Sequence, residues 1–162
     1  MKKELKLAFV MMTSLLVSCG PGLNDDVVSL GGGYFYRREG LDDKYIYYHQ
    51  SNERKDIYPK VVSYAYDSTF ILVAQTPMKG YGRSSLASLL NRGQANFDEL
   101  LNKADSLIAN DPYYVEIYSS SINYWIVDKE TDKLYGPYSL EKYQAKRNEL
   151  NIPDDLKLDV KP

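Results

Sequence analysis

The sequence predicts an α+β fold, in which an antiparallel β-sheet of about five to seven strands carries one long helix and a short C-terminal helix. Several short segments rich in Tyr, Val and Ile lie between turn-forming residues, which is typical of strands. Residues 69–75 are almost continuously apolar, as in a central strand that is covered on both faces. Residues 96–109 instead place their apolar side chains at helical spacing along one stripe.

Taken in chain order, the expected strands are separated by short polar turns or by helical segments. They cover residues 34–37, 44–49, 57–66, 69–75, 123–128 and 133–138. The first two and the last two are expected to form hairpins, because only a short polar turn separates the members of each pair.

The expected helices follow from capping residues. Asn96, with Glu99 three residues later, has the form of a helix start, and this helix should end near residue 109. Asp111-Pro112 could open another helix, but Tyr113 to Tyr118 could equally be a strand. Residues 79–85 are expected to form a flexible loop before a short helical stretch, and Ser139 is expected to cap the C-terminal helix.

The N-terminal residues have the composition of a lipoprotein signal peptide. Three lysines precede an apolar stretch at residues 7–17, and Leu16-Val17-Ser18 leads into Cys19, the only cysteine. This stretch is too short for a transmembrane helix, which needs about 20 apolar residues. We therefore expect cleavage after Ser18, lipidation of Cys19, and attachment to a membrane of the bacterial cell envelope. The outer membrane is the expected location, and the leaflet stays open.

The expected domain organisation has three parts. A signal peptide covers residues 1–18, a lipidated tether covers residues 19–33, and a single α+β domain covers residues 34–158. The tether is expected because residues 20–33 contain Gly, Pro and Asp and show no periodicity.

Composition argues against several classes of function. The formal net charge is −2 and no basic run is present, so nucleic acid is not an expected partner. His49 is the only histidine and the lipid would use Cys19, so neither a metal site nor any other cofactor is expected. A triad that includes His49 is formally open, but no serine lies in a Gly-x-Ser-x-Gly turn. We therefore expect no catalytic residue and no enzyme activity.

The unusual feature of the composition is its sixteen tyrosines, against four phenylalanines and one tryptophan. One interpretation is structural, since Tyr suits the half-exposed face of a sheet. The other is a contact surface, because Tyr and Trp are enriched in interfaces. The candidate binding residues are Tyr45, Tyr47, Tyr64, Tyr66 and Trp125.

These observations favour a lipid-anchored, non-catalytic binding or structural module. Its Tyr-rich face would bind an envelope protein or a glycan. One alternative is an inhibitor or immunity-type lipoprotein that neutralises an envelope toxin or hydrolase. The other is a small enzyme that acts on cell-wall glycan, which would require a cleft with paired carboxylates of raised pKa.

Two stretches together resemble a known family. One is Val62-Ser63-Tyr64-Ala65-Tyr66-Asp67, which leads into Phe70-Ile71-Leu72-Val73-Ala74-Gln75. The other is Tyr124-Trp125-Ile126-Val127-Asp128-Lys129, which continues through Leu134-Tyr135-Gly136-Pro137-Tyr138-Ser139. They resemble an uncharacterised family of small bacterial lipoproteins, classed as a domain of unknown function. The resemblance implies the lipoprotein class and assigns no activity and no site.

Overall fold

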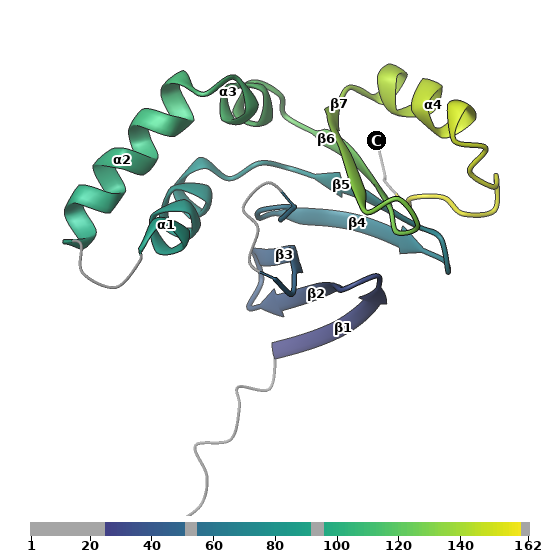
Figure 1. Ribbon diagram of the computed structural model, residues 1–162, viewed down its shortest axis with the longest axis horizontal. Helices are drawn as coiled ribbons and strands as arrows, with labels where there is room; N and C mark the ends of the chain where they lie inside the picture. Colours follow the sequence, from purple (N-terminus) through teal and green to yellow (C-terminus); the bar gives the residue numbers. More distant parts are fainter. Residues whose placement is uncertain (1–24, 51–54, 92–95, 160–162) are drawn as a thin grey trace, which may run out of the picture.

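The computed structural model describes residues 25–50, 55–91 and 96–159. These parts contain two antiparallel sheets, one of three strands and one of four, together with four helices (Figure 1). The expected signal peptide, Cys19 and the first residues of the expected tether lie outside the described residues.

The first sheet, here called the N-terminal sheet, has the order β1-β2-β3. Its strands are β1 (Asp25–Gly31), β2 (Tyr34–Glu39) and β3 (Asp43–Tyr48). The second, here called the central sheet, has the order β4-β5-β6-β7. Its strands are β4 (Val61–Tyr66), β5 (Phe70–Gln75), β6 (Asn123–Asp128) and β7 (Lys133–Tyr138).

The predicted α+β class is confirmed, and seven strands lie within the expected number, but the single sheet is wrong. Beyond β3, the described residues continue the ladder of the N-terminal sheet with one bridge between Ile46 and Ile57, and β4 then pairs with β5. The two sheets instead contact each other through side chains. The rings of Tyr36 and Tyr64 stack with their centroids 4.5 Å apart. A hydrophobic pattern predicts strands, but it does not predict which strands share hydrogen bonds.

The expectation of an irregular tether up to residue 33 is also wrong for Asp25–Gly31. This segment forms β1 and pairs with β2 along its length, from Asp25 opposite Glu39 to Gly31 opposite Tyr34. Leu30 is buried and Val28 packs against the core, whereas Val27 is exposed. The alternation of these side chains is that of a strand with one covered face.

Three of the helices lie between β5 and β6, and the fourth follows β7. They are α1 (Lys79–Leu90), α2 (Phe97–Asn110), α3 (Pro112–Ser119) and α4 (Leu140–Glu149). The expected caps are present at α2, where Asn96 Oδ1 accepts from Asp98 N at 3.0 Å, and at α4, where Ser139 Oγ accepts from Lys142 N. Asp111 Oδ1 likewise accepts from Tyr113 N at 2.9 Å, so the open segment is a helix with Pro112 in its first turn.

The flexible loop expected at residues 79–85 is wrong, because this segment is the first half of α1. Two glycines, which disfavour a helix, misled the prediction. One of them, Gly82, is buried against α3, and a Cβ placed there would lie 1.5 Å from the Tyr118 hydroxyl. The close approach of α1 and α3 therefore requires a glycine at this position.

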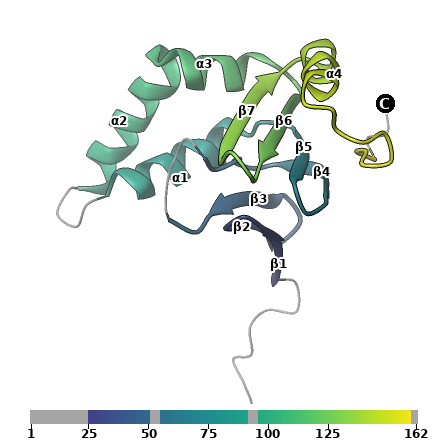
Figure 2. The ribbon, with the colours of Figure 1, turned by 45° about the vertical axis from the view of Figure 1, so that its right-hand side comes forward.

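The central sheet is covered on both faces, as predicted for β5 (Figures 1 and 2). Ile71, Val73 and Trp125 point to the side of α1–α3 and the N-terminal sheet, where the larger core lies. Leu72 and Ile126 point to the opposite side and pack with α4 and the C-terminal segment. Among the described residues, none of the helices combines the length and apolarity that crossing a bilayer requires.

Candidate functional site

The five candidate binding residues do not share one face. Tyr45 and Tyr47 of β3 are half-buried and project from the outer face of the N-terminal sheet, away from the central sheet. Tyr64 and Tyr66 of β4 point toward the N-terminal sheet instead. Trp125 of β6 is 1% exposed and lies in the core. These five candidate residues therefore do not form one continuous surface.

Trp125 belongs to a buried polar network. Its Nε1 donates to Gln75 Oε1 at 2.9 Å, and Asn123 Nδ2 donates to the same oxygen at 3.2 Å. Gln75 Nε2 in turn donates to the backbone oxygen of Tyr58 at 2.8 Å. Because every polar group in this chain of contacts has a partner, the network fixes the segment around Tyr58 against the central sheet.

Tyr64 and Tyr66 close the space between the two sheets. Tyr64 stacks on Tyr36 of the N-terminal sheet, and its ring also lies against that of Tyr66, with centroids 6.3 Å apart. Burial, as the largest cause, raises the pKa of both Tyr36 and Tyr64. Tyr36 and Tyr64 therefore belong to the contact between the two sheets. Tyr66, by contrast, is 44% exposed to solvent.

A cluster of three rings lies on the outer face of the N-terminal sheet. Phe35 and Tyr47 are directly opposite each other on β2 and β3 and stack with centroids 5.5 Å apart and planes 20° apart. Tyr45 follows on β3, with its ring 6.0 Å from that of Tyr47. All three are half-buried. Phe35, Tyr45 and Tyr47 are called the outer ring cluster below.

A cavity of about 280 Å³ lies beside the outer ring cluster. It is bounded by the start of β3, by the segment from Asp56 to Pro59, and by one side of α1. Its described lining residues are Glu39, Asp43, Tyr45, Ile46, Tyr47, Asp56, Ile57, Tyr58, Pro59, Ser85, Ser88 and Leu89. Three of these are carboxylates and three are tyrosines, so the cavity combines negative charge with aromatic surface.

The carboxylates of Glu39 and Asp43 belong to residues directly opposite each other where β2 turns into β3. Like charges at such a position repel, which destabilises the pair. Arg37 forms an ion pair with Glu39 at 2.5 Å. Burial, followed by the charge of Glu39, raises the pKa of Asp43, and Arg37 only partly opposes the shift.

The opposite wall is fixed by hydrogen bonds from the two sheets. Asp56 Oδ1 accepts from the backbone N–H of Tyr48 at 2.8 Å, which joins this wall to β3. Tyr58 is 5% exposed, and the network of Gln75 and Trp125 holds its backbone. Burial is the largest cause that raises the pKa of the Tyr58 hydroxyl, with Tyr114 of α3 as the next.

Asp128 and Lys129, at the end of the second quoted stretch, have structural roles. Asp128 Oδ1 accepts from the backbone N–H groups of Glu130 and Thr131, which closes the turn before β7. Lys129 Nζ donates to the backbone oxygen of Leu30 at 2.9 Å and also to that of Asp67. Lys129 therefore joins the N-terminal sheet to the central sheet, and this contact is called the lysine clamp below.

The comparisons with known proteins give one family match, which begins at the last residue of β1. The family model described as "Protein of unknown function (DUF3997)" matches residues 31–161. The chain belongs to this family. No curated protein and no solved structure matched the sequence.

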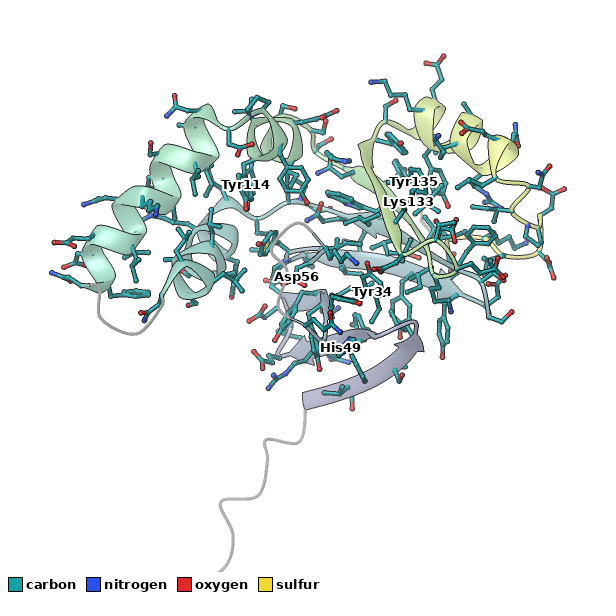
Figure 3. The ribbon with its side chains drawn as sticks, in the orientation of Figure 1. Tyr34, His49, Asp56, Tyr114, Lys133 and Tyr135 are labelled. Carbon is teal, nitrogen blue, oxygen red and sulfur yellow. The ribbon has the colours of Figure 1, made fainter. Side chains whose placement is uncertain are left out.

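The remaining chemical candidates of this DUF3997 protein are sparse. His49 is exposed at the end of the N-terminal sheet, where its Nδ1 lies 3.2 Å from the Gly33 backbone oxygen and its ring packs edge-on against Tyr48 (Figure 3). Among the described residues, no group of three or more His, Cys, Asp or Glu side chains could hold a metal ion.

Sequence reasoning on this DUF3997 protein missed Phe35, Glu39, Asp43 and Asp56. A signal was available for two of them, because the expected hairpin of residues 34–49 turns at Gly40 and so places Glu39 near Asp43. No comparable signal exists for Ser85 and Ser88, which reach the cavity only because α1 packs beside β3.

Proposed function

We propose that this protein is a lipid-anchored, non-catalytic binding module of the bacterial cell envelope, which binds a partner protein through the outer ring cluster and the adjoining cavity. The observation that carries the proposal is the position of three half-buried rings beside a cavity with polar walls. Aromatic side chains enriched at interfaces combine a large apolar area with few rotatable bonds, which lowers the entropy lost on binding.

The contrast with the other rings supports this assignment. Trp125, Tyr36 and Tyr64 contact other elements of the fold, and these contacts account for their presence. The rings of the outer cluster contact mainly one another and face away from the core of the central sheet. Paired rings that a fold does not cover are the usual anchors of a binding surface.

The anchor places this surface near a membrane. Only residues 20–24 separate Cys19 from β1. Six residues of extended chain advance about 20 Å, so a lipid on Cys19 would keep β1 within that distance of the bilayer. The partner would then be a protein of the same membrane or of the adjacent compartment.

The anchor is tested by metabolic labelling of full-length protein with a palmitate analogue. The wild type should be labelled and should fractionate with membranes, whereas Cys19→Ser should be unlabelled. A wild type that is unlabelled and remains in the aqueous fraction would contradict the lipoprotein assignment.

The surface is tested by photo-crosslinking in cells, with a crosslinking phenylalanine analogue in place of Tyr47. The control carries the same analogue in place of Val115, which is 44% exposed on α3. A specific product should form at position 47, should be absent at position 115, and should decrease with Tyr45→Ala. Equal products at both positions would contradict the proposal. A secreted toxin or hydrolase as the crosslinked partner would make this protein an inhibitor of the immunity type.

One observation favours a second candidate function, an enzyme acting on cell-wall glycan. Glu39 and Asp43 are neighbouring carboxylates at a cavity, and the pKa of Asp43 is raised by burial. Glycosidases use two carboxyl groups, one of them protonated as a general acid. If this candidate is right, the wild type should release reducing ends from purified cell-wall glycan, and both Glu39→Gln and Asp43→Asn should abolish the release. A wild type that releases none would dismiss this candidate.

A further inference from the structure

The described walls of the cavity beside the outer ring cluster carry acidic side chains and no basic side chain. Of its described lining residues, Glu39, Asp43 and Asp56 are acidic and none is basic. Arg37 neutralises Glu39 from outside the cavity, and Asp56 accepts a backbone hydrogen bond. The nearby basic side chains of Arg37 and Lys60 form ion pairs with Glu39 and Asp42, and Arg37 only partly offsets the charge of Asp43.

From this arrangement we infer that the cavity accepts a basic side chain, Arg or Lys, presented by the partner protein. The inference rests on the proposed binding function and names the chemistry of its ligand. The cation would lie between the Asp43 carboxylate and the faces of Tyr45 and Tyr47, while the partner's backbone would pack on Phe35.

Three properties of the cavity favour a cation over a neutral ligand. A positive charge near Asp43 offsets the repulsion from Glu39, whereas a sugar leaves that repulsion in place. Half-buried tyrosine rings attract cations through their faces. The volume of about 280 Å³ lies just below the usual range for ligand sites, which suits one inserted side chain better than an extended glycan.

The protein already uses tyrosine rings in this way elsewhere. Lys55 Nζ lies 4.3 Å from the ring centroid of Tyr48, and Lys146 Nζ lies 5.0 Å from that of Tyr135. Each of these lysines also pairs with a carboxylate, Lys55 with Asp132 and Lys146 with Glu149. A ring together with a carboxylate thus holds an ammonium group at two positions of the same fold, and the cavity offers both groups without a basic residue among its described lining.

The inference is tested with the full-length chain in neutral detergent and two short peptides, Gly-Ser-Arg-Ser-Gly and the same peptide with citrulline in place of arginine. Citrulline has the shape of arginine but lacks its charge. Backbone amide resonances are followed by NMR during each titration. The arginine peptide should shift the resonances of residues 43–47 and 85–89, and the citrulline peptide should bind about tenfold more weakly, as expected for loss of a charged hydrogen bond.

Two variants separate a specific site from general charge attraction. Asp43→Asn should weaken binding of the arginine peptide about tenfold. Asp154→Asn removes the same charge from the exposed C-terminal segment and should change binding less than twofold, since exposed distant charges are screened by salt. Equal losses in both variants would overturn the inference, as would equal binding of the citrulline peptide.

A neutral probe separates failure of this inference from failure of the proposed function. Chitotetraose that binds in the cavity more tightly than the arginine peptide would overturn the basic side chain as ligand. If the crosslink at position 47 persists while Asp43→Asn has no effect on it, the binding module stands and only the cationic ligand is wrong. If that crosslink is itself no stronger than the one at position 115, the proposed function fails.

Discussion

The two sheets use strands of similar length in different ways. In β6 five of six residues are buried, whereas in β3 only Ile46 is. Both strands contain tyrosine, but Tyr124 of β6 stacks on Tyr143 of α4. Tyr47 of β3 instead stacks on Phe35 of the same sheet, and the ring of Tyr45 lies tilted against that of Tyr47. The central sheet therefore holds the fold together, and the N-terminal sheet presents a surface. Composition alone shows many tyrosines but does not separate these two roles.

The largest expected effect contrasts one ring from each sheet. Trp125→Ala should lower the free energy of unfolding by about 4 kcal/mol, because it opens a cavity in the core and removes a donor to Gln75. Tyr47→Ala should lower it by about 1 kcal/mol or less, because its ring is half-buried. Urea unfolding followed by circular dichroism measures both. Equal losses would mean that the outer ring cluster is structural.

The next effect concerns buried tyrosines at alkaline pH. Burial is the main cause that raises the pKa of Tyr34 and Tyr58 above the ordinary value of 10.0, and it raises the pKa of Tyr118 to about 12. In the unfolded chain the same hydroxyls ionise near pH 10. The folded state therefore holds these protons more tightly than the unfolded chain does. The stability that the three hydroxyls contribute is fully present below pH 10 and is lost as the pH rises through the raised pKa values.

Each of these tyrosines should cost about 1.4 kcal/mol of stability per pH unit between pH 10 and its own raised pKa. Urea unfolding at a series of values from about pH 8 to about pH 12 should therefore show a steep loss above pH 10. Tyr58→Phe should make the loss shallower, since it removes one of these groups. A profile that stays flat above pH 10 would show that these rings are not sealed from water.

The third effect tests the lysine clamp between the sheets. Lys129→Met keeps the length of the side chain but removes the donor to the backbone oxygens of Leu30 and Asp67, and should cost about 2 kcal/mol. Gly32 also depends on this contact, because a Cβ there would lie 2.8 Å from the Lys129 side chain. Lys133→Met, on the exposed side of β7, is the matched control and should change stability little.

Amide hydrogen exchange distinguishes the clamp from a general loss of stability. In Lys129→Met the amides of β1 and β2 should exchange faster than those of β5 and β6, because the N-terminal sheet would open first. Equal acceleration in both sheets would mean that Lys129 supports the whole core and not the contact between sheets.

The difference between the two sheets also explains which parts of the fold the sequence could predict. The strands of the central sheet and the caps Asn96 and Ser139 were predicted correctly, except that β4 begins at Val61 and not at residue 57, because burial patterns and caps are local signals. β1 was missed because its four-residue run of Val27 to Leu30 is short and follows Gly, Pro and Asp residues. The division into two sheets depends on contacts between distant residues, such as that of Lys129 with Leu30, and no local pattern reports them.

The candidate site shows the same limit. Tyr45 and Tyr47 were predicted from composition and strand position, and the structure places them together with Phe35. Tyr64, Tyr66 and Trp125 have the same local pattern, but they face another part of the fold. Whether a ring in a strand is covered depends on the layer that packs on it, and here that layer comes from a segment far away in the sequence.

The smallest expected effect has opposite signs for stability and for binding. Asp43→Asn removes a half-buried charge that lies opposite Glu39, so it should raise the free energy of unfolding by about 0.5 kcal/mol at neutral pH. The pKa of Asp43 is raised above its ordinary value of 3.8, so the cost of its charge is present at higher pH and disappears as the pH falls through the raised pKa. The difference between variant and wild type should therefore shrink in acid.

The adjacent Asp42 is the matched control for this prediction. Lys60 pairs with Asp42 and lowers its pKa, so Asp42→Asn should not stabilise the protein. Both variants are compared by urea unfolding and by titration with the arginine peptide. If Asp43→Asn lowers stability, then Asp43 is a structural residue of the β2–β3 turn. If it raises stability and weakens peptide binding, the N-terminal sheet retains a charge that its own fold disfavours, which is expected where a surface serves a ligand.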